Sequence, residues 1–211
     1  MRRILFRYRG YSMAPFGLFL LIFGRPSFES FFIGLGLCAA GEFIRIWGVG
    51  YAGISTRKSY LEAESLITAG PFRYVRHPLY LGNSLIGLGG TVMAAGRYSG
   101  GTAWIFFLVW LVFYVLVYGT LIPLEESFLE TRFGEIYQIY RKKIPLILPT
   151  FTAYSESSGK YEWEKAWRSE IHTLIPLLIV ILLMFLKITY PFTVKLQVSH
   201  SASFLLNFFK L

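Results

Sequence analysis

The chain contains very little cysteine, histidine and charge. Its 211 residues include one cysteine, Cys38, and three histidines, and only 16% of the residues are charged. A single cysteine excludes an internal disulfide and any cysteine-based metal site. Because Cys38 lies inside an apolar run, we interpret it as a small buried hydrophobic residue. No three metal-ligating residues occur at a suitable spacing, so we expect no metal site.

What the sequence has in excess is apolar and aromatic residues. It is 55% hydrophobic, with a mean hydropathy of +0.51, and includes 20 Phe, 14 Tyr and 5 Trp. This composition is too apolar for an ordinary soluble domain and suits a protein at the bilayer interface. The net charge of +9 is spread between apolar segments, which favours positions beside a lipid bilayer over nucleic-acid binding. We predict an all-α, polytopic helical membrane protein that does not bind nucleic acid.

Apolar runs predict about five transmembrane helices. They are expected at roughly 11–24, 28–54, 78–95, 100–124 and 171–186, with Pro123 marking the end of the fourth. The first run follows a basic stretch, as in a signal peptide. Because Gly24-Arg25-Pro26 is a poor cleavage site, we interpret this run as a retained segment. We divide the chain into a membrane core, residues 1–150, and a C-terminal part, residues 151–211. The C-terminal part comprises a polar linker on the membrane surface, the fifth helix and a tail.

The distribution of basic residues predicts the orientation. With five crossings and a cytoplasmic N-terminus, the cytoplasmic segments hold 15 Lys and Arg residues and the opposite segments hold 5. Basic residues concentrate on the cytoplasmic side of membrane proteins. We therefore expect the N-terminus and the segments 55–77 and 124–170 to be cytoplasmic.

A short polar stretch, residues 70–82, separates two apolar segments. Pro78 keeps His77 out of the helical region and suits the first position of a helix. Arg76 and His77 are then expected beside the free amides of a helix N-terminus, a favourable place for an anionic group. Taken alone, His77 is better explained as a polar cap at the membrane interface, and Arg73 as a positively charged anchor.

Glu125 and Glu126 are adjacent carboxylates where the fourth apolar run meets a predicted amphipathic helix, residues 124–143. An acidic pair in a first helical turn can simply complement the helix dipole. However, the predicted topology places both residues on the same side as Arg76 and His77. Together these side chains offer acceptors for an ammonium or ribose hydroxyls and donors for a carboxylate. They suit a zwitterionic nucleoside ligand.

Glu42 and Arg45 lie inside the second apolar run, three residues apart and therefore on one helix face. Ionisable residues within a membrane segment suggest function, so both are candidates for contact with a substrate. A mutually satisfied pair that fixes the helices explains them equally well, and both interpretations stay open.

Two motifs carry a resemblance to a known family. The stretch Gly70-Pro71-Phe72-Arg73-Tyr74-Val75-Arg76-His77-Pro78-Leu79-Tyr80-Leu81-Gly82 is followed by Glu125-Glu126-x-x-Leu129-x-x-x-Phe133-Gly134-x-x-Tyr137-x-x-Tyr140 and Ile144-Pro145. This combination resembles the isoprenylcysteine carboxyl methyltransferases and related phospholipid methyltransferases, integral-membrane enzymes that use S-adenosyl-L-methionine. The resemblance implies cofactor contacts at Arg76, His77, Pro78, Leu79, Tyr80, Glu125 and Glu126, with Leu66 and Ile67 beside the adenine.

The resemblance also implies the reaction. The sulfonium methyl of the cofactor would pass in line to a lipophilic methyl acceptor that arrives from the bilayer, while the protein supplies positioning and excludes water. No residue is assigned as a catalytic base. In the eukaryotic prenylcysteine enzymes, an arginine about four residues before the acidic pair is associated with the acceptor carboxylate. Leu121 stands there in this chain, so methyl transfer is better supported than a prenylcysteine substrate.

Two other functions remain open at this point. Membrane sterol reductases resemble the same family in their C-terminal half, use NADPH, and typically carry Arg-Asp-Glu where this chain has Leu124-Glu125-Glu126. A non-catalytic membrane protein that binds lipid would also retain the polar turn. Binding of S-adenosylhomocysteine or of NADPH would separate the three possibilities.

Overall fold

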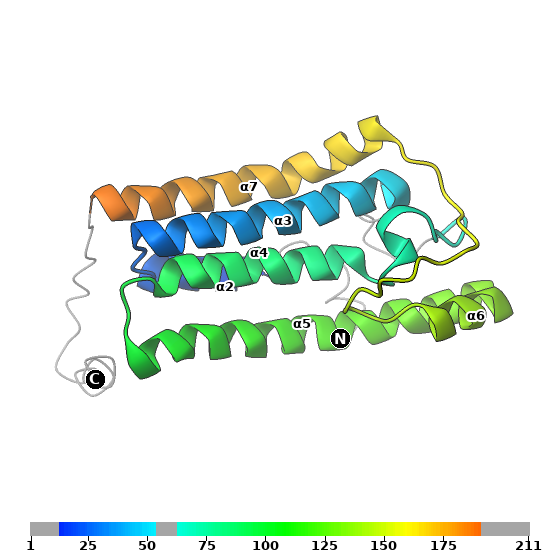
Figure 1. Ribbon diagram of the computed structural model, residues 1–211, viewed down its shortest axis with the longest axis horizontal. Coiled ribbons are helices and arrows are strands. Elements are labelled where there is room, and N and C mark those ends of the chain that lie inside the picture. The colour runs from blue at the N-terminus through cyan, green and yellow to red at the C-terminus, as the bar shows by residue number, and fades with distance from the viewer. Residues whose placement is uncertain (1–12, 54–62, 191–211) are drawn as a thin grey trace.

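The structure is a computed structural model that describes residues 13–53 and 63–190. The described residues form helices and no strand: α2 (Ala14–Phe23), α3 (Phe28–Ala52), the 3-10 turn η3 (Gly70–Arg73), α4 (Pro78–Ala95), α5 (Gly100–Phe133), α6 (Glu135–Lys143) and α7 (Trp163–Thr189). The predicted all-α fold is therefore confirmed. Figure 1 shows α3, α4, α5 and α7 running along one axis, with η3, α6 and the long connections gathered at one end.

Three helices, α3, α5 and α7, are long and apolar enough to cross a membrane by length and composition. Helix α2 is apolar but has only 10 residues, and the 18-residue α4 is not among the three. All five predicted segments are helical, but five crossings are not confirmed. The basic N-terminus, most of the polar segment 55–64 and the tail lie outside the described residues.

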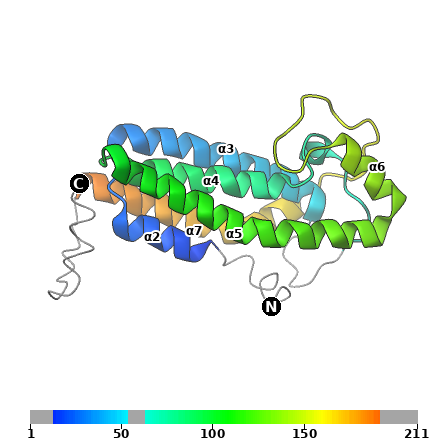
Figure 2. The same ribbon diagram turned by 90° about the horizontal axis from the view of Figure 1, so that it is seen from below.

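The boundary predicted at Pro123 was wrong. Helix α5 continues through Pro123 to Phe133, because a proline removes one backbone donor and neighbouring groups can compensate for it. The actual break is at Gly134, whose φ of 54° lies in the left-handed region that glycine adopts readily. As Figure 2 shows, the chain changes direction there and enters α6.

The fifth helix begins earlier than the predicted residue 171, so the polar linker is shorter than predicted. Helix α7 begins at Trp163 and continues through Pro176, so residues 163–170 are its first two turns. A tertiary contact explains the difference, since Glu170 is 1% exposed and is ion-paired with Arg45 of α3. The division of the chain at residue 150 stays a prediction.

Helices α3 and α4 approach each other through paired glycines. A Cβ on Gly34 would lie 2.4 Å from the carbonyl oxygen of Gly89, and one on Gly41 would lie 2.6 Å from that of Gly82. Small residues allow this direct backbone contact within membrane bundles. The pairing fixes α4 against α3, and α4 begins immediately after His77, so it also fixes the polar turn. Cys38 is 2% exposed in the adjacent apolar core, as expected.

Candidate functional site

The polar end of the bundle brings together side chains from the turn, α4, α5 and α6. Glu126 is at its centre: it accepts hydrogen bonds from Arg76 Nη1, from His77 Nε2 at 2.7 Å and from the hydroxyl of Tyr137 at 2.5 Å. Tyr80 donates to Glu125 Oε1 at 2.6 Å, and His77 Nδ1 lies 3.5 Å from Glu125 Oε2. We call these six residues the polar cluster: Arg76, His77, Tyr80, Glu125, Glu126 and Tyr137.

The members of the polar cluster differ in exposure. His77 is 6% exposed and Glu126 is 8% exposed, so their hydrogen bonds are shielded from water. The side chain of Glu125 is 22% exposed and is the more accessible carboxylate. Arg76 Nε is buried and makes no hydrogen bond to any residue in the described ranges. A buried, unsatisfied donor is costly, and an acceptor on a ligand that reached this nitrogen would satisfy it.

The two carboxylates control the protonation of His77. Burial alone would lower the pKa of this imidazole, but hydrogen bonds and charge attraction from Glu125 and Glu126 outweigh burial and raise it above the ordinary 6.5. Burial and the hydrogen bond to Glu126 raise the pKa of Tyr137, which therefore keeps its proton as a donor. The cluster holds one cation, an imidazole whose protonated form is favoured, and two carboxylates.

Backbone hydrogen bonds hold the turn from a distant part of the sequence. The amides of Arg76 and His77 donate to the carbonyl oxygens of Pro145 and Leu146, at 2.9 and 3.2 Å. Arg73 and Tyr154 are doubly joined: the Tyr154 amide donates to the Arg73 carbonyl, and Arg73 Nε donates to the Tyr154 carbonyl. Hydrogen bonds with residues 145–154 thus hold the turn in place. Arg73 joins the turn to the segment that contains Tyr154.

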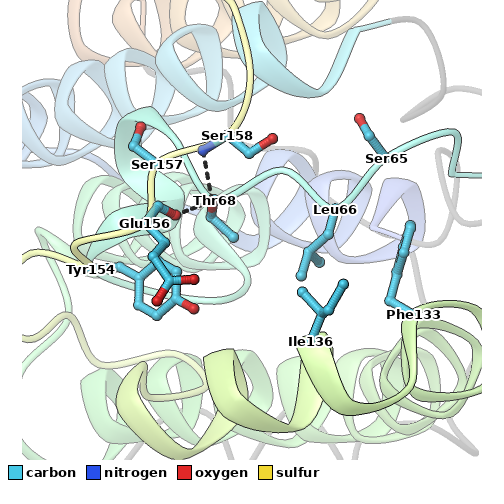
Figure 3. Close-up of a pocket in the computed structure, with 9 residues that line it drawn as sticks. All are labelled: Ser65, Leu66, Thr68, Phe133, Ile136, Tyr154, Glu156, Ser157 and Ser158. Carbon is cyan, nitrogen blue, oxygen red and sulfur yellow. Dashed lines mark hydrogen bonds between the residues drawn. The ribbon is translucent and has the colours of Figure 1, made fainter.

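A cavity of about 420 Å³ is lined by residues outside the polar cluster. In Figure 3, Leu66, Phe133 and Ile136 form its apolar end, and Tyr154, Glu156 and Ser157 lie at the other, with Thr68 and Ser158 between them. Leu66 and Phe133 also pack against a tyrosine-rich group that includes Tyr137, which reaches Glu126. A planar apolar group and several hydroxyls could be accommodated here.

The predicted contacts do not all meet in one place. Arg76, His77, Tyr80, Glu125 and Glu126 converge in the polar cluster, and Leu66 lines the cavity. Pro78 is the first residue of α4. The side chain of Leu79 lies next to Gly48 of α3, and that of Ile67 lies next to Gly159 rather than among the cavity residues.

Glu42 and Arg45 belong to a separate buried network. Arg45 Nε lies 3.6 Å from Glu42 Oε2, so the two interact as expected for residues on one helix face. The main partner is Glu170 of α7, whose two oxygens accept from Arg45 Nη2 at 2.8 and 2.9 Å. Asn83 and Thr173 also accept hydrogen bonds from Arg45. This arrangement explains the pair by helix packing and leaves a role in substrate contact a prediction.

Reasoning from the sequence did not assign Tyr137, Tyr154 or Glu156 to the site. Tyr137 stands in the motif that carries the family resemblance, and it lies on the apolar face of the predicted helix 124–143. That position indicated a packing role and gave no reason to expect its hydrogen bond to Glu126. Tyr154 and Glu156 gave no signal, because they lie in an irregular segment after that helix.

The polar cluster has the chemistry of an organic ligand site, because it combines a guanidinium, an imidazole and two carboxylates. Among the described residues, no group of three or more His, Cys, Asp or Glu side chains could hold a metal ion.

The chain is similar in sequence to several curated proteins. The chain is 34% identical over 121 residues to the protein-S-isoprenylcysteine O-methyltransferase of Schizosaccharomyces pombe, covering 54% of this chain and 48% of that protein. It is 34% identical over 122 residues to a probable protein-S-isoprenylcysteine O-methyltransferase of Oryza sativa subsp. indica, covering 56% of this chain and 60% of that protein. It is also 30% identical over 128 residues to the cobalt-zinc-cadmium resistance protein CzcN of Cupriavidus metallidurans, covering 60% of this chain and 50% of that protein.

The chain thus spans roughly half the length of the curated relatives it matches. No solved structure matches it significantly. The model of the phospholipid methyltransferase family matches residues 30–136, which include the turn, all of α4 and α5, and both carboxylates. The three long apolar helices agree with the integral-membrane character that the resemblance implies. The chain belongs to the phospholipid methyltransferase family.

Proposed function

We propose that this protein transfers a methyl group from S-adenosyl-L-methionine to a lipid-like acceptor at the membrane face where α5 meets α6. The observation that carries the proposal is the polar cluster, formed largely within the region that matches the family. A partly apolar cavity is linked to it through Leu66 and Phe133, which pack against the tyrosine group that includes Tyr137. The names of the relatives from Schizosaccharomyces and Oryza supply the reaction class.

The described residues fit this methyl donor. Arg76 Nε is a buried donor with no acceptor among them, which suits a carboxylate, and the partly exposed Glu125 suits an ammonium. The cavity offers Leu66 and Phe133 to a planar base and the carboxylate of Glu156 to hydroxyl groups. We assign cofactor contacts to the polar cluster and to Leu66, while contacts at Ile67, Pro78 and Leu79 remain predictions from the resemblance.

Bound S-adenosyl-L-methionine supplies a methyl group already activated by its sulfonium centre. The protein then needs to bind, orient and exclude water rather than form a covalent intermediate. Arg76 neutralises Glu126, and His77 and Tyr137 fix the orientation of the Glu126 carboxylate by hydrogen bonds to Oε1. Because Glu126 is buried and surrounded by donors, its role is to hold the site, and no base is assigned.

The acceptor is proposed as a membrane lipid or a lipid-modified group, reaching the site from the bilayer while the cofactor enters from the cytoplasm. The charge distribution supports a cytoplasmic N-terminus and a cytoplasmic polar cluster. Leu121 is 2% exposed in an apolar group with Tyr80, Tyr118 and Ile122, so this position offers no cation to an acceptor carboxylate.

The test uses purified protein in lipid nanodiscs with methyl-labelled cofactor. We expect label to enter the lipid fraction, with base-labile label indicating an ester and base-stable label indicating an amine or another acceptor. Glu126→Gln should abolish both transfer and binding of S-adenosylhomocysteine in calorimetry. Glu130→Gln, at an exposed carboxylate paired with Arg141, is the matched control and should keep both. Binding of NADPH without binding of S-adenosylhomocysteine would overturn the proposal.

A further inference from the structure

The segment that follows α6 exposes large apolar side chains. We call residues 144–151 the proline loop, since it contains Pro145 and Pro149. Leu148 is 78% exposed and Phe151 is 105% exposed, and Leu146 is 37% exposed. Burying one such side chain is worth about 1.5–3 kcal/mol, so a group of them facing water would be costly.

The depth of the proline loop relative to α5 can be read from its packing. Ile147 packs against the apolar group of Tyr80, Tyr118, Leu121 and Ile122. The three α5 members of this group precede Glu125 by three to seven residues and lie in the charge-free part of the helix. At about 1.5 Å per residue, they lie roughly 5–10 Å from Glu125 toward the middle of the apolar span. The proline loop therefore reaches the level of the hydrocarbon layer.

Part of the backbone of the proline loop is satisfied by hydrogen bonds within the protein. Irregular backbone is tolerated at membrane depth only where its polar groups are satisfied by protein. Pro145 and Pro149 have no amide hydrogen to satisfy. The carbonyl oxygens of Pro145 and Leu146 accept from the turn, and the amide of Thr150 donates to the carbonyl of Tyr74 at 2.9 Å.

Basic residues flank the proline loop on the side of α6. Arg141, Lys142 and Lys143 immediately precede it and are exposed. Each basic residue near an anionic membrane surface contributes about 1 kcal/mol of attraction. A loop with exposed apolar residues and cations immediately before it matches the hydrocarbon and headgroup layers of a bilayer. Helix α5 also exposes apolar side chains, and Leu116 is 64% exposed.

We propose that the proline loop is a re-entrant membrane anchor: Leu148 and Phe151 insert into the hydrocarbon layer beside α5, and this insertion holds the turn through the carbonyl oxygens of Pro145 and Leu146. The partner of the loop is a bilayer that contains anionic lipid. The inference depends on the membrane setting of the helices and not on methyl transfer, so the two proposals can fail separately.

The first test measures depth. Leu148→Cys is labelled with an environment-sensitive fluorophore, and the full chain is reconstituted in vesicles of phosphatidylcholine and phosphatidylglycerol. We expect a blue-shifted emission that nitroxides on the lipid acyl chains quench and that iodide does not. The same label on Ser155→Cys, an exposed polar position nearby, should show the reverse, and the unaltered chain measures any background from the buried Cys38.

Quenching of the Leu148→Cys label by iodide rather than by lipid nitroxides would overturn membrane insertion. Protection from both, together with efficient cross-linking of two Leu148→Cys chains by a bifunctional maleimide, would assign the surface to a second copy and also overturn it. The second test measures the link to the turn. In vesicles, Leu148→Asp should accelerate hydrogen exchange of the amides of residues 73–77. Ile139→Asp, the same change at an exposed position of α6, should not. Equal exchange in both variants would contradict the proposed link.

Discussion

Both carboxylate oxygens of Glu170 accept hydrogen bonds from the same nitrogen of Arg45, at 2.9 and 2.8 Å. Glu170 is 1% exposed and Arg45 is 8% exposed, so this ion pair between α7 and α3 is shielded from water. Helix α7, which lies after the family-matched region, is therefore fixed to α3 by a buried ion pair.

Removing one partner of this pair should be strongly destabilising. Glu170→Ala leaves the buried Arg45 guanidinium without its main counter-charge, and breaking a buried ion pair in this way costs about 3–5 kcal/mol. We expect a large fall in the thermal unfolding temperature in detergent. Glu164→Ala is the control, because its pair with Arg168 is exposed and an exposed pair contributes about 1 kcal/mol or less. Similar effects of both changes would contradict the importance of burial.

Tyr137 should position Glu126. Tyr137→Phe removes the hydroxyl that donates to Glu126 Oε1, and hydrogen bonds to charged groups contribute about 1.5–3 kcal/mol, so we expect S-adenosylhomocysteine to bind about tenfold or more weakly. Tyr140→Phe removes a neighbouring hydroxyl that instead donates to the Phe72 carbonyl oxygen. Calorimetry should therefore separate the two variants, with the larger loss of affinity in Tyr137→Phe. The reverse order would remove Tyr137 from the site.

The raised pKa of His77 predicts a direction for pH dependence. A group whose pKa is higher in the folded state contributes stability that is fully present below its unfolded pKa and is lost as the pH rises through its folded pKa. Because Glu125 and Glu126 raise the pKa of His77 above 6.5, the unfolding temperature should fall as the pH is increased from about 6.5. This contribution to the slope should disappear in His77→Gln and persist in His172→Gln, at an exposed position of α7. An unchanged slope in His77→Gln would exclude His77 as its source.

Filling the cavity should block the cofactor. Ser157 lines the cavity and Ser155 does not, although both are exposed in the same segment. Ser157→Trp should therefore weaken binding of S-adenosylhomocysteine substantially, and Ser155→Trp should leave it nearly unchanged. Thermal unfolding of both variants checks that each remains folded. Equal binding by folded Ser157→Trp and unaltered protein would separate the cavity from the cofactor site.

The glycine contacts predict opposite responses at two positions of α3. Gly41→Ala places a methyl group against the Gly82 carbonyl oxygen and should force α3 and α4 apart, lowering stability. Nothing lies within 4 Å of a Cβ at Gly36, so Gly36→Ala should be neutral or stabilising by up to about 1 kcal/mol. Unfolding temperatures in detergent provide the comparison. Destabilisation of equal size at both positions would point to a general intolerance of alanine.

Much of the helical framework could be predicted from local sequence. The helix that begins at Pro78 was anticipated because a proline restricts both its own conformation and that of His77. The end expected at Pro123 was wrong because the surroundings of a membrane helix can accept a missing donor, whereas Gly134 supplies the unusual dihedral angle that a sharp bend requires. A local rule identified Pro123, but the surroundings of the helix decide whether a proline ends it.

The candidate site could be predicted in part. Arg76, His77 and Glu126 were expected together because their types suggested complementary chemistry and the predicted topology placed them on one side. The contacts from Pro145, Tyr154 and Glu170 could not be predicted, since they depend on how a long connection folds back and how α7 packs. Every residue has a backbone carbonyl group, so the sequence does not indicate which carbonyl oxygen accepts a hydrogen bond.

The backbone pairing between residues 73–77 and 145–154 has a consequence for protein synthesis. When translation has reached Lys143, the nascent chain already contains every side chain of the polar cluster but lacks the Pro145 and Leu146 carbonyl oxygens that hold the turn. Glu170 is translated later still. The turn can therefore be held by these carbonyl groups only after synthesis has continued past Tyr137, the last cluster residue, to Pro145 and Leu146.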